Sequence, residues 1–466
     1  MKKVVDIIKE LRSTSSRNEK EAILTTNKDN ETLKKVFYLA YDPSINFYIK
    51  SIPYEDNWKH GEYFEYDEND EFEILFDVLE TIYSRELTGN KAISFLTGVL
   101  SERSTEMQEL ICNIVKKDLD CGVQTTTINK IWKGLITDPP YMGYQLFSEK
   151  LIKSFKLPCY SQIKLDGLYA DVFVMKDSVS YRSRSGINCK FKLPDNVEEK
   201  LLNLSQFSDV EFVLHCEALV RKGESFTEFE ERKIGNGYLN SDESDPGKVV
   251  IVIWDVVGID EYNNRKSTED YSERFNLVEK IVEYVDTPHV QMVESRFCNA
   301  TQDVIDHFVE SRSKGMEGTV IKSPKLKWKD GKVKDGLKLK NEFVVEMKII
   351  GFQEHSKRSG QIGAIFVESE DGVVKCKVGS GLTDAQRKKF FLTQDEMIGK
   401  IVTVKGNDLV TNELKQDRHS VFLPRFVEVR DDKTVADMFD KIMATKDSII
   451  DLLKNIKGSG HHHHHH

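Results

Sequence analysis

The chain has 466 residues, of which 39% are hydrophobic and 31% are charged, and its formal net charge is −10 at pH 7. This length exceeds what one ordinary core holds, so roughly two or three domains are expected. The sequence has no signal-peptide pattern, no apolar run long enough to span a bilayer and no Cys-x-x-Cys pair among its seven cysteines. These features argue against an exported, membrane-bound, disulfide-stabilised or zinc-ribbon protein, and they predict a cytoplasmic one.

Two segments bias the composition. Residues 458–466 read as a short linker and a six-histidine tag, which holds half of the twelve histidines. Glu55 to Glu80 contains eleven acids and one lysine, so this segment alone supplies the surplus of negative charge. It is interpreted as solvated surface, with a partner-binding surface as the alternative. Because local charge decides contact with phosphate, the net charge does not exclude a DNA-binding face.

The N-terminal part, residues 1 to about 133, is predicted to be mainly helical. Apolar residues recur at helical spacing in residues 33–40 and in Met107–Leu119. Asp138-Pro139-Pro140 interrupts this pattern, so a domain boundary is expected nearby.

From about Cys159 the hydrophobic period changes to two, which is typical of strands. Strand-like stretches occur at Phe173-Val174, Val210–Val220 and Val249–Val257. Helical stretches at Glu273–Val285 and Asp303–Ser313 interrupt them. This mixture predicts an α+β domain.

A second β-rich stretch begins near Val344. Its strand-like runs at residues 346–350, 364–367 and 400–404 are separated by glycine-bearing turns. Several short strands of this kind predict a small barrel, and an amphipathic helix is expected after Asp437.

Lys164-Leu165-Asp166-Gly167 lies between two strand-like runs. A lysine amine attacks phosphorus only when it is neutral, and burial together with nearby cations favours that form. Glycine allows the backbone to approach a phosphate closely. Taken alone, these four residues also fit a surface turn.

Further motifs follow along the chain. Alternation in Val210–Val220 places Glu211, His215 and Glu217 on one strand face. Leu337-Lys338-Leu339-Lys340 also alternates, and two lysines on one face without adjacent acids suit a phosphate, although a solvated edge strand has the same pattern. The remaining segments are Ser183-Arg184-Ser185-Gly186, Trp254-Asp255 and Glu317-Gly318-Thr319-Val320-Ile321-Lys322.

In this order and rough spacing, the motifs resemble the nucleotidyltransferase motifs of ATP-dependent DNA ligases, and more loosely those of RNA ligases and mRNA capping enzymes. Residues 378–384 and 422–433 resemble segments of the ligase OB domain, and residues 118–122 resemble the ligase DNA-binding domain. The likeness spans nearly the whole untagged chain and is greatest to the ligases of T-even-type bacteriophages. It implies a multidomain protein with an all-α DNA-binding domain (1–133), an α+β nucleotidyltransferase or adenylation domain (134–342) and a C-terminal β-barrel OB-fold domain with a final helix (343–457).

The resemblance implies ATP-dependent sealing of nicks in double-stranded DNA by a monomer in the cytoplasm, which for a phage protein is that of the host. Lys164 would form a covalent lysyl-AMP, the AMP would pass to the 5′-phosphate at the nick, and the 3′-hydroxyl would displace it. Glu217 and Glu317 are the expected ligands of Mg²⁺ or Mn²⁺, because hard carboxylate oxygens suit such ions. Glu217 alternatively holds the ribose.

The resemblance also assigns residues to the nucleotide. Trp254 would stack on adenine, with a plain core tryptophan as the alternative. Arg184 would contact the ribose or the side of the 3′-hydroxyl. The full expected ATP- and AMP-binding set is Gln162, Lys164, Arg184, Glu217, Trp254, Lys322, Lys338, Lys340, Arg430 and Lys433.

The cations of this set are assigned to phosphates. Lys338 and Lys340 would hold the α-phosphate, for which Lys322 is a weaker candidate. Arg430 and Lys433, together with Asp432, would orient the leaving pyrophosphate, although an exposed charged turn has the same composition.

Two motifs depart from the family pattern. Tyr169 stands where the family usually has an arginine that is associated with phosphate contact, and Arg182 is the hypothesised replacement. His215-Cys216-Glu217 stands in place of Asp-Gly-Glu. His215 is interpreted as a hydrogen-bonded structural residue and not as a catalytic one.

Contact with DNA is expected from a lysine-rich loop between the Glu-Gly and Leu-Lys-Leu-Lys motifs. Its lysines fit either non-specific contact with the DNA backbone or plain solvation. The candidate DNA-binding residues are Lys325, Lys327, Lys329 and Arg182.

Two other functions are weighed against this interpretation. An RNA ligase or a capping-type nucleotidyltransferase shares the central motifs, but the long helical N-terminal part argues against both. A non-catalytic nick-binding protein would have a decayed site, whereas Lys164, Glu217 and Glu317 are intact. Use of NAD is disfavoured, because the four-cysteine zinc cluster expected of NAD-dependent ligases is absent from the sequence.

Overall fold

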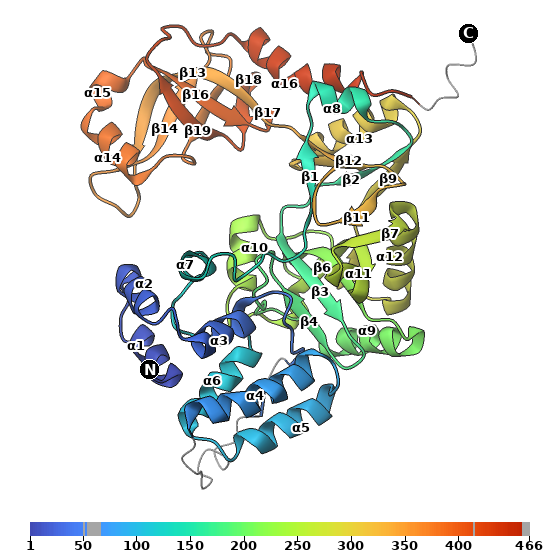
Figure 1. Ribbon diagram of the computed structural model, residues 1–466. Helices are drawn as coiled ribbons and strands as arrows, with labels where there is room; N and C mark the ends of the chain where they lie inside the picture. The colour runs from blue at the N-terminus through green and yellow to red at the C-terminus, as the bar shows by residue number, and fades with distance from the viewer. Residues whose placement is uncertain (50–51, 54–66, 413–414, 459–466) are drawn as a thin grey trace. The chain divides into compact units, whose positions relative to one another are not determined.

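The computed structural model describes residues 1–49, 52–53, 67–412 and 415–458 (Figure 1). The chain divides into two compact units. The first contains Met1–Met142, Asp166–Val293 and Lys327–Gly331, and the second contains Gly143–Leu165, Glu294–Leu326 and Lys332–His466. Residues 134–342 therefore contribute to both units, and the expected domain boundaries stay a prediction. The histidine tag and much of the acidic segment lie outside the described residues.

Helices make up the N-terminal part of the first unit, where the described residues up to Ile131 contain no strand. They are α1 (Val4–Arg12), α2 (Arg17–Thr26), α3 (Glu31–Tyr41), α4 (Glu68–Tyr83), α5 (Gly89–Leu100), α6 (Thr105–Val115) and α7 (Thr125–Ile131). The side chains of Ser16, Asn30 and Ser104 each accept a hydrogen bond from the third residue of the helix that follows, which satisfies an otherwise unpaired backbone N–H group. The apolar faces of these helices share one buried core.

The helix expected at residues 33–40 is confirmed by α3. The helix expected over Met107–Leu119 is shorter than predicted, because α6 ends at Val115. Lys117 has a φ of 65°, a conformation that a right-handed helix cannot include. Its ammonium group is buried and donates hydrogen bonds to the carbonyl oxygens of Leu39 and Asp42.

A five-stranded sheet forms the second part of the first unit. Its strands, in the order β4-β3-β5-β6-β8, are Val179–Arg182, Leu168–Val174, Phe212–Val220, Val249–Gly258 and Val290–Met292. Neighbouring strands are antiparallel except β6 and β8, which are parallel. Helices α9 (Asp195–Ser208) and α12 (Tyr271–Val285) pack on this part, and β7 (Lys266–Asp270) pairs with β11 (Lys327–Lys329). The strands and the helix expected here are confirmed.

A second five-stranded sheet lies in the second unit. Its strands, in the order β1-β12-β10-β2-β9, are Met142–Leu146, Gly331–Lys340, Gly318–Lys322, Cys159–Ile163 and Ser295–Cys298. Ile321, Leu337 and Leu339 project from one face into a core with helices α8 (Glu149–Ser154), α13 (Thr301–Ser313) and α16 (Phe439–Leu453). The opposite face carries mainly polar side chains.

The remaining strands form the β-rich C-terminal part of the second unit. The five-stranded sheet β15-β14-β13-β16-β19 comprises Lys375–Val378, Ile362–Glu368, Phe343–Glu354, Ile401–Gly406 and Arg425–Arg430. A hairpin of β17 (Asp408–Asn412) and β18 (Lys415–Phe422) and helices α14 (Asp384–Leu392) and α15 (Gln394–Met397) accompany it. Among the residues that the structure describes, no helix has the length and apolar character needed to cross a membrane.

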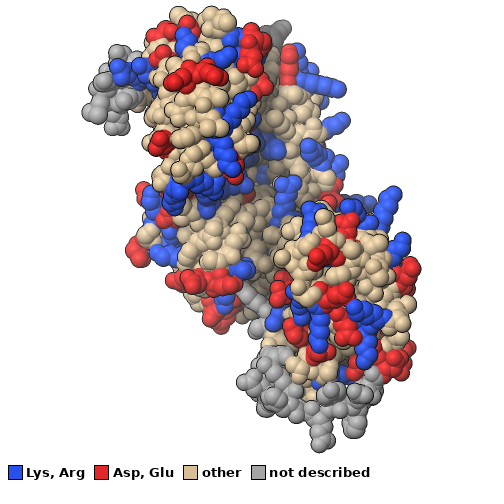
Figure 2. Space-filling view, turned by 90° about the vertical axis from the view of Figure 1, so that its left-hand side faces the viewer, with Lys and Arg blue, Asp and Glu red and all other residues tan. Residues whose placement is uncertain are grey.

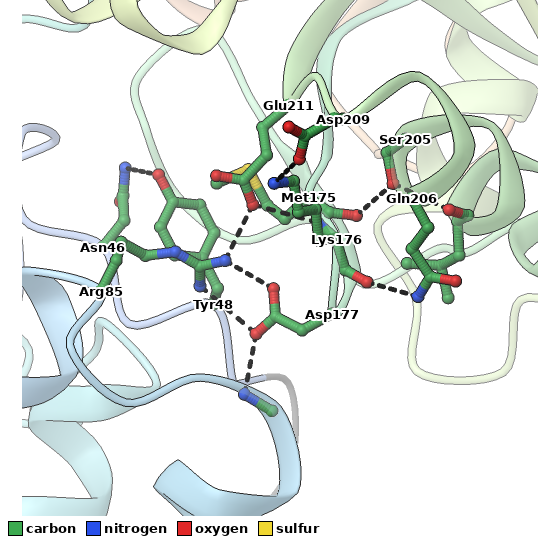
Figure 3. Close-up of polar contacts among 12 residues, drawn as sticks. Asn46, Tyr48, Arg85, Met175, Lys176, Asp177, Ser205, Gln206, Asp209 and Glu211 are labelled. Carbon is green, nitrogen blue, oxygen red and sulfur yellow. Dashed lines mark hydrogen bonds and ion pairs between the residues drawn. The ribbon is translucent and has the colours of Figure 1, made fainter.

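A partly buried cluster of charges joins the N-terminal helices to the sheet of the first unit (Figure 3). Arg85, just after α4, donates hydrogen bonds to Asp177 at 2.6 Å and to Glu211 at 2.9 Å, and its guanidinium carbon lies 4.8 Å from the ring centroid of Tyr48. The backbone N–H of Gly89 donates to the same Asp177 carboxylate at 2.8 Å. These contacts fix the α4–α5 connection against the β3–β4 turn and the start of β5.

Arg85→Met should destabilise the first unit, because the aliphatic stem remains while Asp177 and Glu211 lose their cation. Leaving partly buried carboxylates unpaired costs about 1–3 kcal/mol of the free energy of unfolding, which urea denaturation would measure. Lys176→Ala is the matched control, because Lys176 pairs with Asp209 in an exposed position beside the cluster. An equal loss in both variants would show that the Arg85 contacts have no special role in stability.

Candidate active site

Most of the expected phosphate-binding residues share the polar face of the sheet in the second unit. The register of β10 sets Val320 opposite both Gln162 of β2 and Lys338 of β12, and sets Gly318 opposite Lys340. Because side chains alternate along a strand, this face carries Gln162, Lys164, Lys322, Lys338 and Lys340. The alternation predicted for Leu337–Lys340 is confirmed, since both leucines are fully buried and both lysines are half-buried.

Lys164 follows β2 directly and pairs with the glutamate of the next motif. Its ammonium group lies 2.8 Å from one carboxylate oxygen of Glu317, and the ammonium group of Lys340 lies 3.9 Å from the other. The Lys164 and Glu317 side chains are each 23% exposed. The backbone N–H of Lys164 donates to the carbonyl oxygen of Gly318 at 3.0 Å. The Lys164 motif and the Glu317 motif are thus joined through both backbone and side-chain contacts. Lys164 remains partly exposed and accessible to a substrate.

The glycines of these motifs are explained by close backbone contacts. A Cβ atom on Gly318 would lie 2.0 Å from the carbonyl oxygen of Leu339, so any side chain would force β10 and β12 apart. A Cβ atom on Gly167 would lie 2.7 Å from the carbonyl oxygen of Ala218. The absence of a side chain on Gly167 allows the close approach of β5, and its expected role in the approach of a phosphate stays a prediction.

In the first unit, Glu217 and Trp254 come from neighbouring strands. The predicted strand face of β5 is supported by its register with β3, which sets Tyr169 opposite Glu217 and Asp171 opposite His215. On the other side of β5, His215 pairs with Asp255 and Cys216 with Ile253. Trp254 is therefore the extra residue of a β-bulge, a feature that redirects side chains beside active sites. Its side chain is half-buried, so a fully buried core role does not describe it.

The two candidate arginines have different surroundings. Arg184 is exposed, and its guanidinium carbon lies 4.0 Å from the ring centroid of Tyr141. Arg182 is only 5% exposed and lies over the ring of Phe173 at 5.2 Å. Burial lowers the pKa of its guanidinium. Contact between Arg182 and DNA would require this side chain to leave its place, which does not favour the hypothesis that it replaces the family arginine.

Most of the lysine-rich segment forms strands, whereas a loop was predicted. Lys327–Lys329 form β11, and the residues from Gly331 belong to β12. Lys325, Lys327 and Lys329 are exposed, whereas the intervening Leu326 and Trp328 are buried. Lys327 forms an ion pair with Asp270. The exposed lysines remain candidates for contact with a DNA backbone.

The predicted pyrophosphate-binding residues meet at a buried glutamate that the motifs did not indicate. Arg430 donates to Glu346 at 2.7 Å and to Asp432 at 2.9 Å, and Lys433 lies 3.8 Å from Glu346. Thr403 donates to the second oxygen of Glu346 at 2.8 Å. The Arg430 guanidinium holds the pKa of Asp432 at about 2. In the sequence, Glu346 is the one acid among the mainly apolar residues 343–350, and this pattern could have indicated it.

The proposed metal ligands are Glu217, on β5, and Glu317, which directly precedes β10 of a different sheet. Among the described residues, no group of three or more His, Cys, Asp or Glu side chains could hold a metal. Mg²⁺ commonly takes only one or two carboxylates, with substrate phosphates and water as its other ligands. Glu317 and Glu217 are both partly exposed and supply hard oxygen donors, so their chemistry fits such an ion.

Comparisons with known proteins agree with this geometry. The ATP dependent DNA ligase domain matches residues 145–340, and the DNA ligase OB-like domain matches residues 355–430. The DNA ligase of Enterobacteria phage T6 is 29% identical over 94% of this chain and 98% of its own length, and that of phage T4 is 28% identical over the same shares. The DNA ligase of Pyrobaculum islandicum is 31% identical over 31% of this chain and 26% of its own length.

These matches confirm the resemblance to T-even-type phage ligases that the motifs indicated. They show a nucleotidyltransferase domain in the central region and an OB-fold domain in the β-rich C-terminal part. The Lys164, Glu317 and Lys338 motifs all lie within the matched ligase domain, and Arg430 closes the matched OB-like domain. The chain therefore belongs to the ATP-dependent DNA ligases.

Proposed function

We propose that this ligase seals nicks in duplex DNA through a covalent AMP adduct on Lys164. The observation that carries the proposal is the position of Lys164, which is paired with Glu317 at 2.8 Å on a sheet face that also bears Gln162, Lys338 and Lys340. A partly exposed lysine among further cations suits nucleophilic attack on a phosphate.

In the first step, the Lys164 ammonium group loses a proton to solvent, and the neutral nitrogen forms a bond to the α-phosphorus of ATP. The bond from that phosphorus to the pyrophosphate oxygen breaks, and pyrophosphate leaves with its electron pair. Lys338 and Lys340 stabilise the charge that develops on the α-phosphate oxygens. Lys322, which is buried against the ring of Tyr144 at 4.8 Å, supports this positive field. Trp254 stacks on the adenine, and Arg184 contacts the ribose.

In the later steps, an oxygen of the 5′-phosphate at the nick attacks the AMP phosphorus, and the bond to Lys164 breaks. The 3′-hydroxyl then attacks the activated 5′-phosphorus, and AMP leaves with the electron pair of the broken bond. Both steps again build charge on phosphate oxygens, so the same lysines act in each. A bound Mg²⁺ or Mn²⁺ ion would supply further charge neutralisation, with Glu317 and Glu217 as its protein ligands.

The helical N-terminal part is proposed to bind duplex DNA, together with Lys325, Lys327 and Lys329. On the face shown in Figure 2, basic and acidic side chains are interspersed, so basic side chains are available despite the negative net charge. Binding should weaken steeply as salt rises, because phosphate contacts release counterions. The protein is proposed to act as a monomer.

The first experiment is to incubate the protein with Mg²⁺ and, separately, with α-labelled ATP, α-labelled GTP and labelled NAD. The proposal requires a covalent, acid-labile adduct from ATP alone that disappears when nicked duplex DNA is added. An adduct from GTP would indicate a capping-type enzyme. A protein that is free of pre-bound AMP, forms no adduct and still binds nicked duplex would be a non-catalytic nick-binding protein.

A further inference from the structure

Tyr169 lies between two aromatic rings on the sheet face of the first unit that carries Glu217. Its ring centroid is 5.8 Å from that of Trp254 and 5.3 Å from that of Tyr141. The Tyr141 ring in turn lies under the guanidinium of Arg184. One continuous series of ring contacts thus connects the two residues proposed to hold the nucleoside, and Tyr169 is its central member.

The hydroxyl group of Tyr169 is held by two buried polar side chains. It donates a hydrogen bond to an Asp171 carboxylate oxygen at 2.8 Å, and the Nδ1 atom of His215 lies 2.6 Å from the same oxygen. Asp171 and His215 are 2% and 3% exposed. The His215 ring also stacks on Trp328, with centroids 5.6 Å apart and an angle of 16° between the planes. The Asp171 carboxylate binds both the Tyr169 hydroxyl and His215 Nδ1 in a buried site, so these hydrogen bonds fix the direction of the tyrosine ring.

The strand register explains why these groups meet. Tyr169 and Asp171 are alternate residues of β3, and they stand opposite Glu217 and His215 of β5. All four side chains therefore share one face. Tyr169 and His215 are also two of the three positions, with Cys216, at which the sequence departs from the family pattern, and in the structure both contact Asp171. The two motifs that differ from the family pattern are therefore linked through the Asp171 carboxylate.

We propose that Tyr169 is a positioning residue for the adenine nucleotide: its ring holds Trp254 and Tyr141 in place, and Asp171 and His215 anchor its hydroxyl. This inference rests on the proposed function, because it takes Trp254 as the residue that stacks on adenine. Tyr169 touches no reacting atom in this role. Its loss should therefore weaken ATP binding and leave the rate of AMP transfer at saturating ATP nearly unchanged.

The test is to measure the rate of adduct formation as a function of ATP concentration for four variants and the wild type. Trp254→Ala reports the proposed stacking. Tyr169→Phe removes only the anchored hydroxyl, and Tyr169→Leu removes the ring. Tyr181→Phe is the matched control, because Tyr181 lies on β4 of the same sheet and donates to the Glu198 carboxylate at 2.6 Å, away from this face.

We expect KM for ATP to rise about threefold in Tyr169→Phe, which loses the hydrogen bond that anchors the ring, and about tenfold in Tyr169→Leu, which loses the aromatic contacts. The value of kcat should change less than about twofold, and Tyr181→Phe should leave KM unchanged. A lower Tm with unchanged KM in both Tyr169 variants would mean a purely structural role and would overturn the inference. Should Tyr169→Leu fail to fold, the isosteric Tyr169→Phe decides.

Failure of this inference can be told apart from failure of the proposed function. If Trp254→Ala raises KM for ATP and the Tyr169 variants do not, only the positioning role is lost. If Trp254→Ala leaves KM unchanged, the stacking assignment is wrong, and the inference that depends on it is overturned as well.

Discussion

Lys164→Ala should reduce the formation of a protein–AMP adduct to background and should lower sealing with ATP by roughly a thousandfold or more. The alanine side chain has no nucleophile, and neighbouring lysines cannot substitute. Lys340 is held beside the second oxygen of Glu317, and Lys338 lies on β12, which β10 separates from β2 and the position of Lys164. Labelling with α-labelled ATP on the denatured chain measures the effect directly.

Two controls make this result specific. Lys153→Ala removes an exposed lysine that pairs with Glu149 on α8, and it should leave labelling unchanged. A nick that already carries AMP on its 5′-phosphate bypasses the covalent step, so the Lys164 variant should still seal it faster than buffer does. Residual labelled adduct in Lys164→Ala would show that another residue is the nucleophile.

Much of the candidate site could be predicted because its determinants are local. Strand alternation alone places Lys338 and Lys340 on one face and Leu337 and Leu339 on the other, and the structure confirms this placement. Helix α3 follows from the spacing of its apolar residues. The ion pair between Lys164 and Glu317 joins residues far apart in sequence and was not predicted. The resemblance to a family indicated only that both residues belong to one site.

The features that were not predicted depend on contacts between distant segments. The bulge at Trp254 arises from the register of β5 with β6, which no local pattern encodes. The sequence predicts that Arg182 is an accessible cation, but in the structure it is only 5% exposed and lies over the ring of Phe173. The end of α6 is set by Lys117, whose ammonium group binds carbonyl oxygens at the end of α3. Such interactions become visible only when the chain is folded.

Arg430→Ala and Lys433→Ala should slow the formation of the AMP adduct by about 10-fold to 100-fold, while sealing of a pre-adenylylated nick should change less than about threefold. The physical reason is that pyrophosphate leaves only in the first step. Cations that orient it therefore stabilise one transition state and leave the other two unaffected. Parallel single-turnover measurements with ATP and with the pre-adenylylated nick would separate the two effects.

Lys433→Ala is the more decisive variant, because Arg430 also has a structural role. Arg430 bonds the buried Glu346 carboxylate at 2.7 Å, and its loss should disturb the OB-fold domain. Lys433 is 37% exposed and lies 3.8 Å from the same glutamate, so its removal should leave the fold intact. Arg358→Ala is a matched control in this domain, since Arg358 pairs with Asp384 at the surface. Equal losses in adduct formation and in sealing by Lys433→Ala would rule out a role confined to pyrophosphate and would indicate a cation that acts on phosphates in every step.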